Sequence, residues 1–219
     1  MQLWRLTWFT VACAAGATAL VLPPGIAIAW ALARGRFRGR TVLEAVVTLP
    51  LVMPPVATGL ILLMLLGRRG VVGRFLERVG VEVVFTWKAV VVAMAVMGLP
   101  LLVRTARAGF EHVDRRYEQV AATLGAAPLR AFLTVSLPLA WPSVIAGAVL
   151  AFARAVGEFG ATVVVAGSIP GATRTLAVAI YTYSETGRDA QALTLVAISA
   201  AIAFAALICS NALAGRRAA

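Results

Sequence analysis

Long uncharged stretches alternate with short charged segments along this chain. A helix that crosses the hydrocarbon core of a bilayer needs about 20 predominantly apolar residues. The runs that lack Asp, Glu, Lys and Arg cover residues 6–33, 45–67, 89–103, 131–153 and 190–215, and the third run extends through 83–87 on the other side of Lys88. The pattern therefore predicts five membrane-spanning helices.

A sixth apolar region, residues 159–184, has a different character. The segment 168–171 and Arg174 interrupt it, so that 159–173 and 175–184 are each too short to cross a bilayer unaided. Irregular backbone at membrane depth is tolerated only where protein or a water-filled cavity covers it. We therefore expect a broken or re-entrant element here.

Helix-breaking residues occur in four of the five predicted spans. Proline inside a helix removes a hydrogen bond and kinks the axis. We expect breaks or kinks at Pro23 and Pro24 in the first span, Pro50, Pro54 and Pro55 in the second, Gly98 and Pro100 in the third, and Pro138 and Pro142 at the start of the fourth. Such kinks are common in membrane helices, but their number favours a bundle that lines a pathway.

Composition supports a membrane protein. The chain is 61% hydrophobic and 13% charged, with a mean hydropathy of +0.92, whereas soluble domains have roughly 25% charged residues. The excess of 20 Lys and Arg over 9 Asp and Glu lies at the ends of the apolar runs. A nucleic-acid-binding protein would instead gather basic residues on one face of a polar domain, so that class is excluded. Cys13, Cys209 and the single His112 have no metal-ligand spacing, and no cofactor is expected.

The basic residues also predict an orientation. Loops on the cytoplasmic side of a membrane carry an excess of Lys and Arg. The segments 34–40, 104–130 and 216–217 are rich in arginine and fall on one side if the N-terminus is outside and the C-terminus inside. The segment 68–88, on the opposite side, is also basic, so the two sides differ only in how many basic residues they carry.

A partly polar segment separates the third and fourth spans. Its apolar residues recur at helical spacing, and Gly125 and Pro128 suit the end of one helix and the start of the next. We expect two short helices that form an L on the inner face. They could lie on anionic lipid, but the mixture of acidic and basic side chains favours a protein partner. The apolar positions are Val113, Tyr117, Val120, Ala121 and Leu124.

The same segment resembles the EAA motif of permease subunits of ABC importers. The matching residues are Glu118, Ala121, Ala122, Leu124 and Gly125, followed by Leu137 and Pro138. The acid stands one residue before its usual place, which Gln119 occupies, and Val135 replaces the usual isoleucine. The segments 43–73, 120–142 and 150–175 resemble the molybdate/tungstate branch, and sulfate permeases share much of this pattern.

The resemblance implies an all-α integral membrane protein of the type I ABC importer permease fold, with residues 1–219 as a single permease domain. The segment at about 108–138 would couple it to an ABC ATPase subunit in the cytoplasm. Two copies would form a homodimer around the pathway in the cytoplasmic membrane, and an extracytoplasmic binding protein would deliver the oxyanion. The sequence has no GxxxxGK[ST] motif, so ATP hydrolysis is expected on the partner and not on this chain.

Arg154 and Glu158 lie four residues apart near the outer end of the fourth span. Charged groups inside a membrane usually face protein or a cavity. They could form a structural ion pair that locks the turn at 157–160, or they could lie on the oxyanion route. Other classes of protein fit less well. An unrelated secondary transporter would show an internal repeat, and a membrane enzyme would need a nucleophile with a base.

Overall fold

The computed structural model describes residues 2–35 and 37–215, and these residues form helices joined by short loops. Arg36, Arg216 and Arg217, which contributed to the predicted orientation, lie outside the described residues. The elements are α1 (Gln2–Arg34), α2 (Arg40–Val52), α3 (Pro55–Leu66), α4 (Val71–Arg78), α5 (Trp87–His112), α6 (Arg115–Thr123), α7 (Pro128–Ala131), the π-helix η1 (Phe132–Ser136), α8 (Leu137–Val156), α9 (Gly160–Ala166), α10 (Leu176–Glu185) and α11 (Asp189–Gly215).

Four uninterrupted helical stretches are long and apolar enough to cross a membrane. They are Leu3–Arg34, Trp87–His112, Pro128–Val156 and Asp189–Ser210. A fifth apolar stretch comprises α2 and α3, which are bent by 114° relative to each other. The all-helical membrane fold is therefore confirmed. The predicted second span, residues 45–67, is broken between Val52 and Pro55, where its prolines predict a break.

The break between α2 and α3 has a local cause. A residue that precedes a proline is pushed toward extended backbone by a clash with the proline ring. Met53 and Pro54 both precede a proline, and both are extended, with ψ angles of 149° and 130°. Two extended residues in succession end α2, and Pro55 then starts α3 in a new direction.

The prolines of the first and third spans do not break their helices. α1 continues through Pro23 and Pro24, and α5 continues through Pro100. The expected split and interruption are therefore wrong. α1 packs along α5, and α5 also packs along α8. Neighbouring helices can stabilise a backbone that has lost hydrogen bonds to proline, and this packing holds both helices together.

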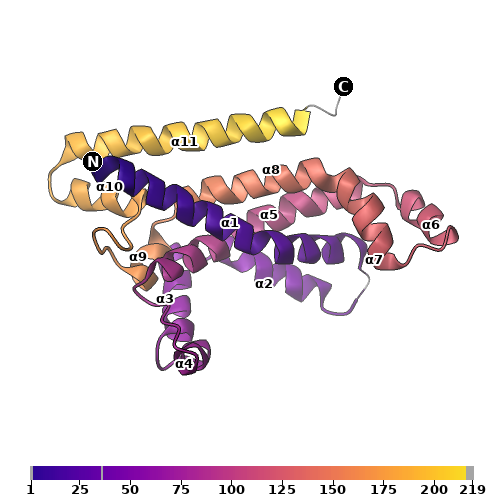
Figure 1. The fold of residues 1–219 in the computed structure, drawn as a ribbon, viewed down its shortest axis with the longest axis horizontal. Coiled ribbons are helices and arrows are strands. Elements are labelled where there is room, and N and C mark those ends of the chain that lie inside the picture. Colours follow the sequence, from indigo (N-terminus) through magenta and orange to yellow (C-terminus); the bar gives the residue numbers. More distant parts are fainter. Residues whose placement is uncertain (1, 36, 216–219) are drawn as a thin grey trace.

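The centre of the bundle is formed by α1, α5 and α8, which lie side by side (Figure 1). Along α5, buried residues such as Val90, Met94 and Leu102 meet Ala151 and Ala155 of α8 in one apolar cluster. Small side chains allow helices to approach closely in lipid, where apolar burial gives little driving force. α11 packs on the outside, against α8 and α10.

The region 159–184 is broken, as its sequence predicts. It forms α9 and α10 with an irregular segment between them. α9 packs against α3, so a second short helix supports the second half of the bent α2–α3 pair. The contact is very close at Gly59, where an added Cβ would lie 2.8 Å from the Cα of Ala161.

Replacement of Gly59 by alanine should therefore destabilise the contact between α3 and α9. The added methyl group would collide with backbone atoms of Ala161, which cannot move aside as the end of a flexible side chain can. Overpacking of this kind costs about 1–3 kcal/mol. Thermal unfolding of the purified protein in detergent would show a lower midpoint. Gly16→Ala in α1 is the matched control, because the nearest atom to an added Cβ there is 4.0 Å away. Equal midpoints for the two variants would contradict the close contact.

The two ends of the bundle differ. The N-terminus lies at one end of the long axis together with α9 and α10, while α6 and α7 project from the other end (Figure 1). α11 runs from the first end back toward the second (Figure 1).

Candidate functional site

The helix α6 and the turn that follows it project from the bundle as a separate knob, which we define as residues 114–131 (Figure 1). Asp114 caps α6, since its Oδ1 accepts a hydrogen bond of 2.9 Å from the backbone N–H of Arg116. Carboxylates stabilise a helix N-terminus by accepting such bonds. This cap explains why a new helix begins at Arg115, only three residues after the end of α5 at His112.

The end of α6 is set by Gly125. Its φ of +83° lies in the left-handed region, which favours glycine. The N–H of Gly125 donates to the carbonyl of Ala122, and that of Ala126 donates to the carbonyl of Ala121, both at 3.0 Å. This is the Schellman pattern of helix termination. The expected turn at Gly125 is confirmed in its geometry.

The second helix of the knob differs from the expected one. α7 begins at Pro128 as predicted, but it passes through η1 directly into α8 and forms the start of the fourth span, Pro128–Val156. The structure therefore contains both predicted short helices, α6 and α7, but the second is the first part of the fourth span and not a helix of its own. A proline ring clashes with the carbonyl four residues earlier, which for Pro138 belongs to Thr134. The wider π-helical turn at η1 precedes Pro138 and relieves this clash.

The knob presents apolar side chains outward. Among the described residues 115–123 of α6 none is buried, and Leu124 is 83% exposed. Exposed apolar patches of this kind, with polar residues around them, are typical of protein interaction sites. The large exposed apolar residues here are Tyr117, Val120, Leu124 and Leu129, with Leu133 in the adjoining η1.

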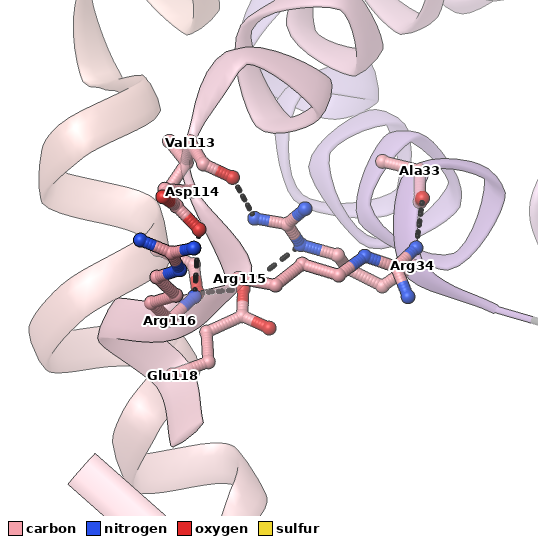
Figure 2. Close-up of polar contacts among 8 residues, drawn as sticks. Ala33, Arg34, Val113, Asp114, Arg115, Arg116 and Glu118 are labelled. Carbon is pink, nitrogen blue, oxygen red and sulfur yellow. Dashed lines mark hydrogen bonds and ion pairs between the residues drawn. The ribbon is translucent and has the colours of Figure 1, made fainter. Parts of the chain in front are cut away.

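A polar network ties the knob to the end of α1. Arg34 Nε donates to Glu118 Oε1 at 2.9 Å, and Arg34 Nη2 donates to the carbonyl of Val113 at 2.7 Å (Figure 2). Ser136 Oγ donates to the same Glu118 oxygen at 2.6 Å. Arg115 Nη2 donates to the carbonyl of Ala33 at 3.4 Å (Figure 2). One carboxylate thus joins α1, α6 and η1.

The residues that the sequence singles out fall into three places. Glu118 lies inside the polar network, at the base of the knob. Ala121, Ala122, Leu124 and Gly125 lie on the knob itself, and all except Ala121 are exposed. Leu137 and Pro138 are the first residues of α8, beyond the knob, and Leu137 packs against a buried cluster of α1, α5 and α8.

Sequence reasoning missed Arg34 and Ser136. Arg34 ends the first apolar run and looks like any other basic residue at a membrane boundary. Ser136 is one of three hydroxyl-bearing residues in the apolar run 131–153, with Thr134 and Ser143, and it is fully buried. A buried hydroxyl needs a hydrogen-bond partner, so its position in a span was the one available signal.

The structure brings Arg154 and Glu158 together at the opposite end of α8. Arg154 Nη1 lies 2.7 Å from Glu158 Oε2, and Glu158 Oε1 accepts a hydrogen bond of 2.8 Å from the N–H of Ala161 in α9. The side chain of Glu158 is 1% exposed and that of Arg154 is 25% exposed. The carboxylate thus links the end of α8 to the start of α9.

The fold and this site define a multi-span helical membrane protein that carries an exposed, partly apolar knob at one end. Comparison with known proteins identifies the class more closely. Residues 25–218 match the family described as binding-protein-dependent transport system inner membrane component. The chain belongs to this family of permeases, which are components of transporters.

Individual relatives agree with this assignment. The chain is similar to the molybdenum transport system permease protein ModB of Escherichia coli (strain K12), with 45% identity over 210 residues, 95% of this chain and 92% of that protein. It also resembles the sulfate transport system permease protein CysT of Salmonella typhimurium, with 41% identity over 157 residues, 72% of this chain and 57% of that one.

The fold is shared with solved ABC transporters. A bacterial ABC transporter involved in the import of the acidic polysaccharide alginate has a chain that matches with a TM-score of 0.73 and 16% identity, covering 99% of this chain and 80% of that one. At this level of identity the likeness establishes the fold alone.

Proposed function

We propose that this chain is the membrane subunit of an ATP-driven ABC importer for molybdate. Two copies would form a homodimer, and the pathway between them would open alternately to each side of the membrane. The single observation that carries this proposal is the projecting knob, with an exposed Leu124 and a glycine-terminated helix. The 45% identity to a molybdenum permease over 95% of the chain supports the choice of ion.

The knob would dock on an ABC ATPase subunit. Apolar residues at its tip would fill a cleft of the partner, and the Schellman turn would keep the tip rigid. Residues at about 108–138 would therefore transmit the closure of the ATPase pair to the spanning helices. Glu118, Leu137 and Pro138 would act at the base of this lever rather than at its contact surface.

The knob end would face the cytoplasm, with the N-terminus outside and the C-terminus inside. The arginine-rich segment 104–130 contains most of the knob, and Arg34 of the basic segment 34–40 contacts it, as expected for basic loops on the cytoplasmic side. A binding protein carrying the oxyanion would then dock at the opposite end, near α4 and α9. The exposed apolar face of α3, with Leu60, Ile61 and Met64, is available to lipid or to a second copy.

Arg154 and Glu158 would serve mainly as a structural pair in this scheme. Both oxygens of Glu158 are already bonded within the chain, one to Arg154 and one to the backbone of α9. A guanidinium neutralised by a buried carboxylate attracts an anion weakly. The pair would therefore hold the turn between α8 and α9 rather than bind the ion.

Affinity purification of the tagged chain from its native membrane tests the proposed function. Mass spectrometry would identify the proteins that co-purify, and the binding protein would be assayed for molybdenum, tungsten and sulfur. We expect an ABC ATPase and a binding protein that holds molybdenum. Sulfate in the binding protein would move this chain to the sulfate branch, and the absence of any ATPase would contradict the proposal.

The purified chain alone should hydrolyse no ATP. It has no P-loop sequence to hold the phosphates, so activity would require the ATPase partner. A phosphate-release assay on the chain, with and without the co-purified ATPase, measures this directly. Hydrolysis by the chain alone would contradict the division of labour between the subunits.

A further inference from the structure

The position of α6 depends mainly on polar contacts. None of the described residues 115–123 is buried, and the helix contacts only its neighbours in sequence, α7 and η1, over any extended area. A short helix with so little packing has low local stability. The hydrogen bonds that reach α6 from elsewhere in the fold therefore decide how firmly it is held.

Arg34, the last residue of α1, supplies one of these bonds and a second one to the residue two positions before α6, while Arg115 of α6 adds a longer bond of 3.4 Å to the carbonyl of Ala33. The Arg34 guanidinium donates to Glu118 inside the first turns of α6 and to the carbonyl of Val113 just before that helix (Figure 2). The Arg34 side chain is 10% exposed, so water screens the contact less than it does a surface ion pair. The planar guanidinium of arginine holds its donors in fixed directions toward the two acceptors, whereas the single ammonium of lysine has no such fixed pair of donors.

Glu118 extends the link to the fourth span. The hydroxyl of the buried Ser136 donates to the same carboxylate oxygen as Arg34 does. Ser136 is the last residue of η1, and single π-helical turns inside helices occur frequently at functional sites. The ends of the first and fourth spans and the exposed helix of the knob therefore meet at one carboxylate.

We propose that Arg34 is a positioning residue for coupling, which clamps α6 to α1 and, through Glu118, to η1, so that the three move as one body. A partner that displaces the clamped knob also displaces both spanning helices. Without the clamp, α6 follows the partner on its own, and ATP is consumed without import. This inference rests on the proposed function, because it assigns Arg34 a role in the same transport cycle.

The number of ATP molecules hydrolysed per molybdate ion imported tests the clamp. The full complex, with its ATPase and binding protein, is reconstituted in liposomes for this measurement. Arg34→Ala should raise the ratio by about tenfold, within the usual range of coupling between sites. Glu118→Gln should act in the same direction, and the double variant should show little further change because both substitutions break one link. Arg34→Lys keeps the charge but loses the fixed pair of donors, so its ratio should be intermediate.

Arg107→Ala is the matched control. Arg107 makes two ion pairs of 2.7 Å, with Glu44 of α2 and Glu111 of α5, and neither reaches α6. Its ratio should equal that of the unmodified complex. A loss of general stability would affect assembly in both variants, whereas the clamp predicts a changed ratio for Arg34→Ala only.

Several outcomes would overturn the inference. They are an unchanged ratio for Arg34→Ala, additive effects in the double variant, or an equal rise for Arg107→Ala. If Arg34→Ala does not assemble, Arg34→Lys decides, and an unchanged ratio there overturns the clamp. If the unmodified complex imports molybdate with ATP, any of these outcomes contradicts the role of Arg34 as a clamp but leaves the proposed function intact. If it does not, the proposed function itself fails.

Discussion

Replacement of Gly125 by valine should abolish coupled transport while the spanning helices stay folded. The φ of +83° at this position is unfavourable for a β-branched residue, with a cost of about 1–2 kcal/mol. Nothing lies within 4 Å of an added Cβ, so the penalty is conformational and not a collision. Relief of this strain requires the turn between α6 and α7 to change, which moves Leu124 and the rest of the docking tip.

Uptake of molybdate in reconstituted vesicles should fall about tenfold or more, because the loss of coupling between two sites typically changes the response by about 5- to 150-fold. Gly187→Val is the matched control. Gly187 has a φ of +68°, an open environment, and the same Schellman pattern, with bonds from Gly187 to Ser184 and from Arg188 to Tyr183. It ends α10, so it carries similar strain away from the knob. Equal loss of uptake in both variants would mean that strain alone, and not docking, explains the effect.

Replacement of Arg154 by alanine should produce the largest loss of stability. It leaves the carboxylate of Glu158, which is 1% exposed, without its partner. Breaking a buried ion pair in this way costs about 3–5 kcal/mol. The partial exposure of Arg154 places the expected value near the lower end. The midpoint of thermal unfolding in detergent would report the loss, together with the yield of folded protein.

Arg68→Ala provides the comparison for Arg154→Ala. Arg68 also pairs with a carboxylate at 2.8 Å, that of Glu82, but its side chain is 78% exposed. Its removal should leave the midpoint unchanged, as for most surface pairs. Addition of Glu158→Gln to Arg154→Ala should recover part of the stability, because a neutral amide is less costly to bury than an unpaired charge. An Arg154→Ala protein as stable as Arg68→Ala would place Arg154 in water.

The apolar runs predicted the spans because a bilayer imposes length and composition on any helix that crosses it. The location of the breaks followed less directly. Pro54 and Pro55 break the helix because two residues in succession precede a proline. Pro23 and Pro24 also stand together, yet α1 continues through them where it packs along α5. The local sequence does not distinguish the two proline pairs, and only the structure shows which of them ends a helix.

The candidate site shows the same division. Gly125 predicted the end of α6 and Pro128 predicted the start of α7, because each residue restricts or frees the conformation of its own backbone. The partners of Glu118 came from residues 84 positions before it and 18 positions after it. Arg34 is one of several arginines in the segment 34–40. Only the fold determines which of them reaches the carboxylate.

Photo-crosslinking from position 124 tests the central claim most directly. A photoreactive amino acid in place of Leu124, at the tip of the knob, would be activated in native membranes, and the crosslinked protein would be identified by mass spectrometry. The same residue in place of Phe85, which is 58% exposed and belongs to the loop before α5, serves as the comparison. We predict that position 124 captures an ABC ATPase and that position 85 does not. Capture of the ATPase from position 85 alone, or from neither position, would contradict the account.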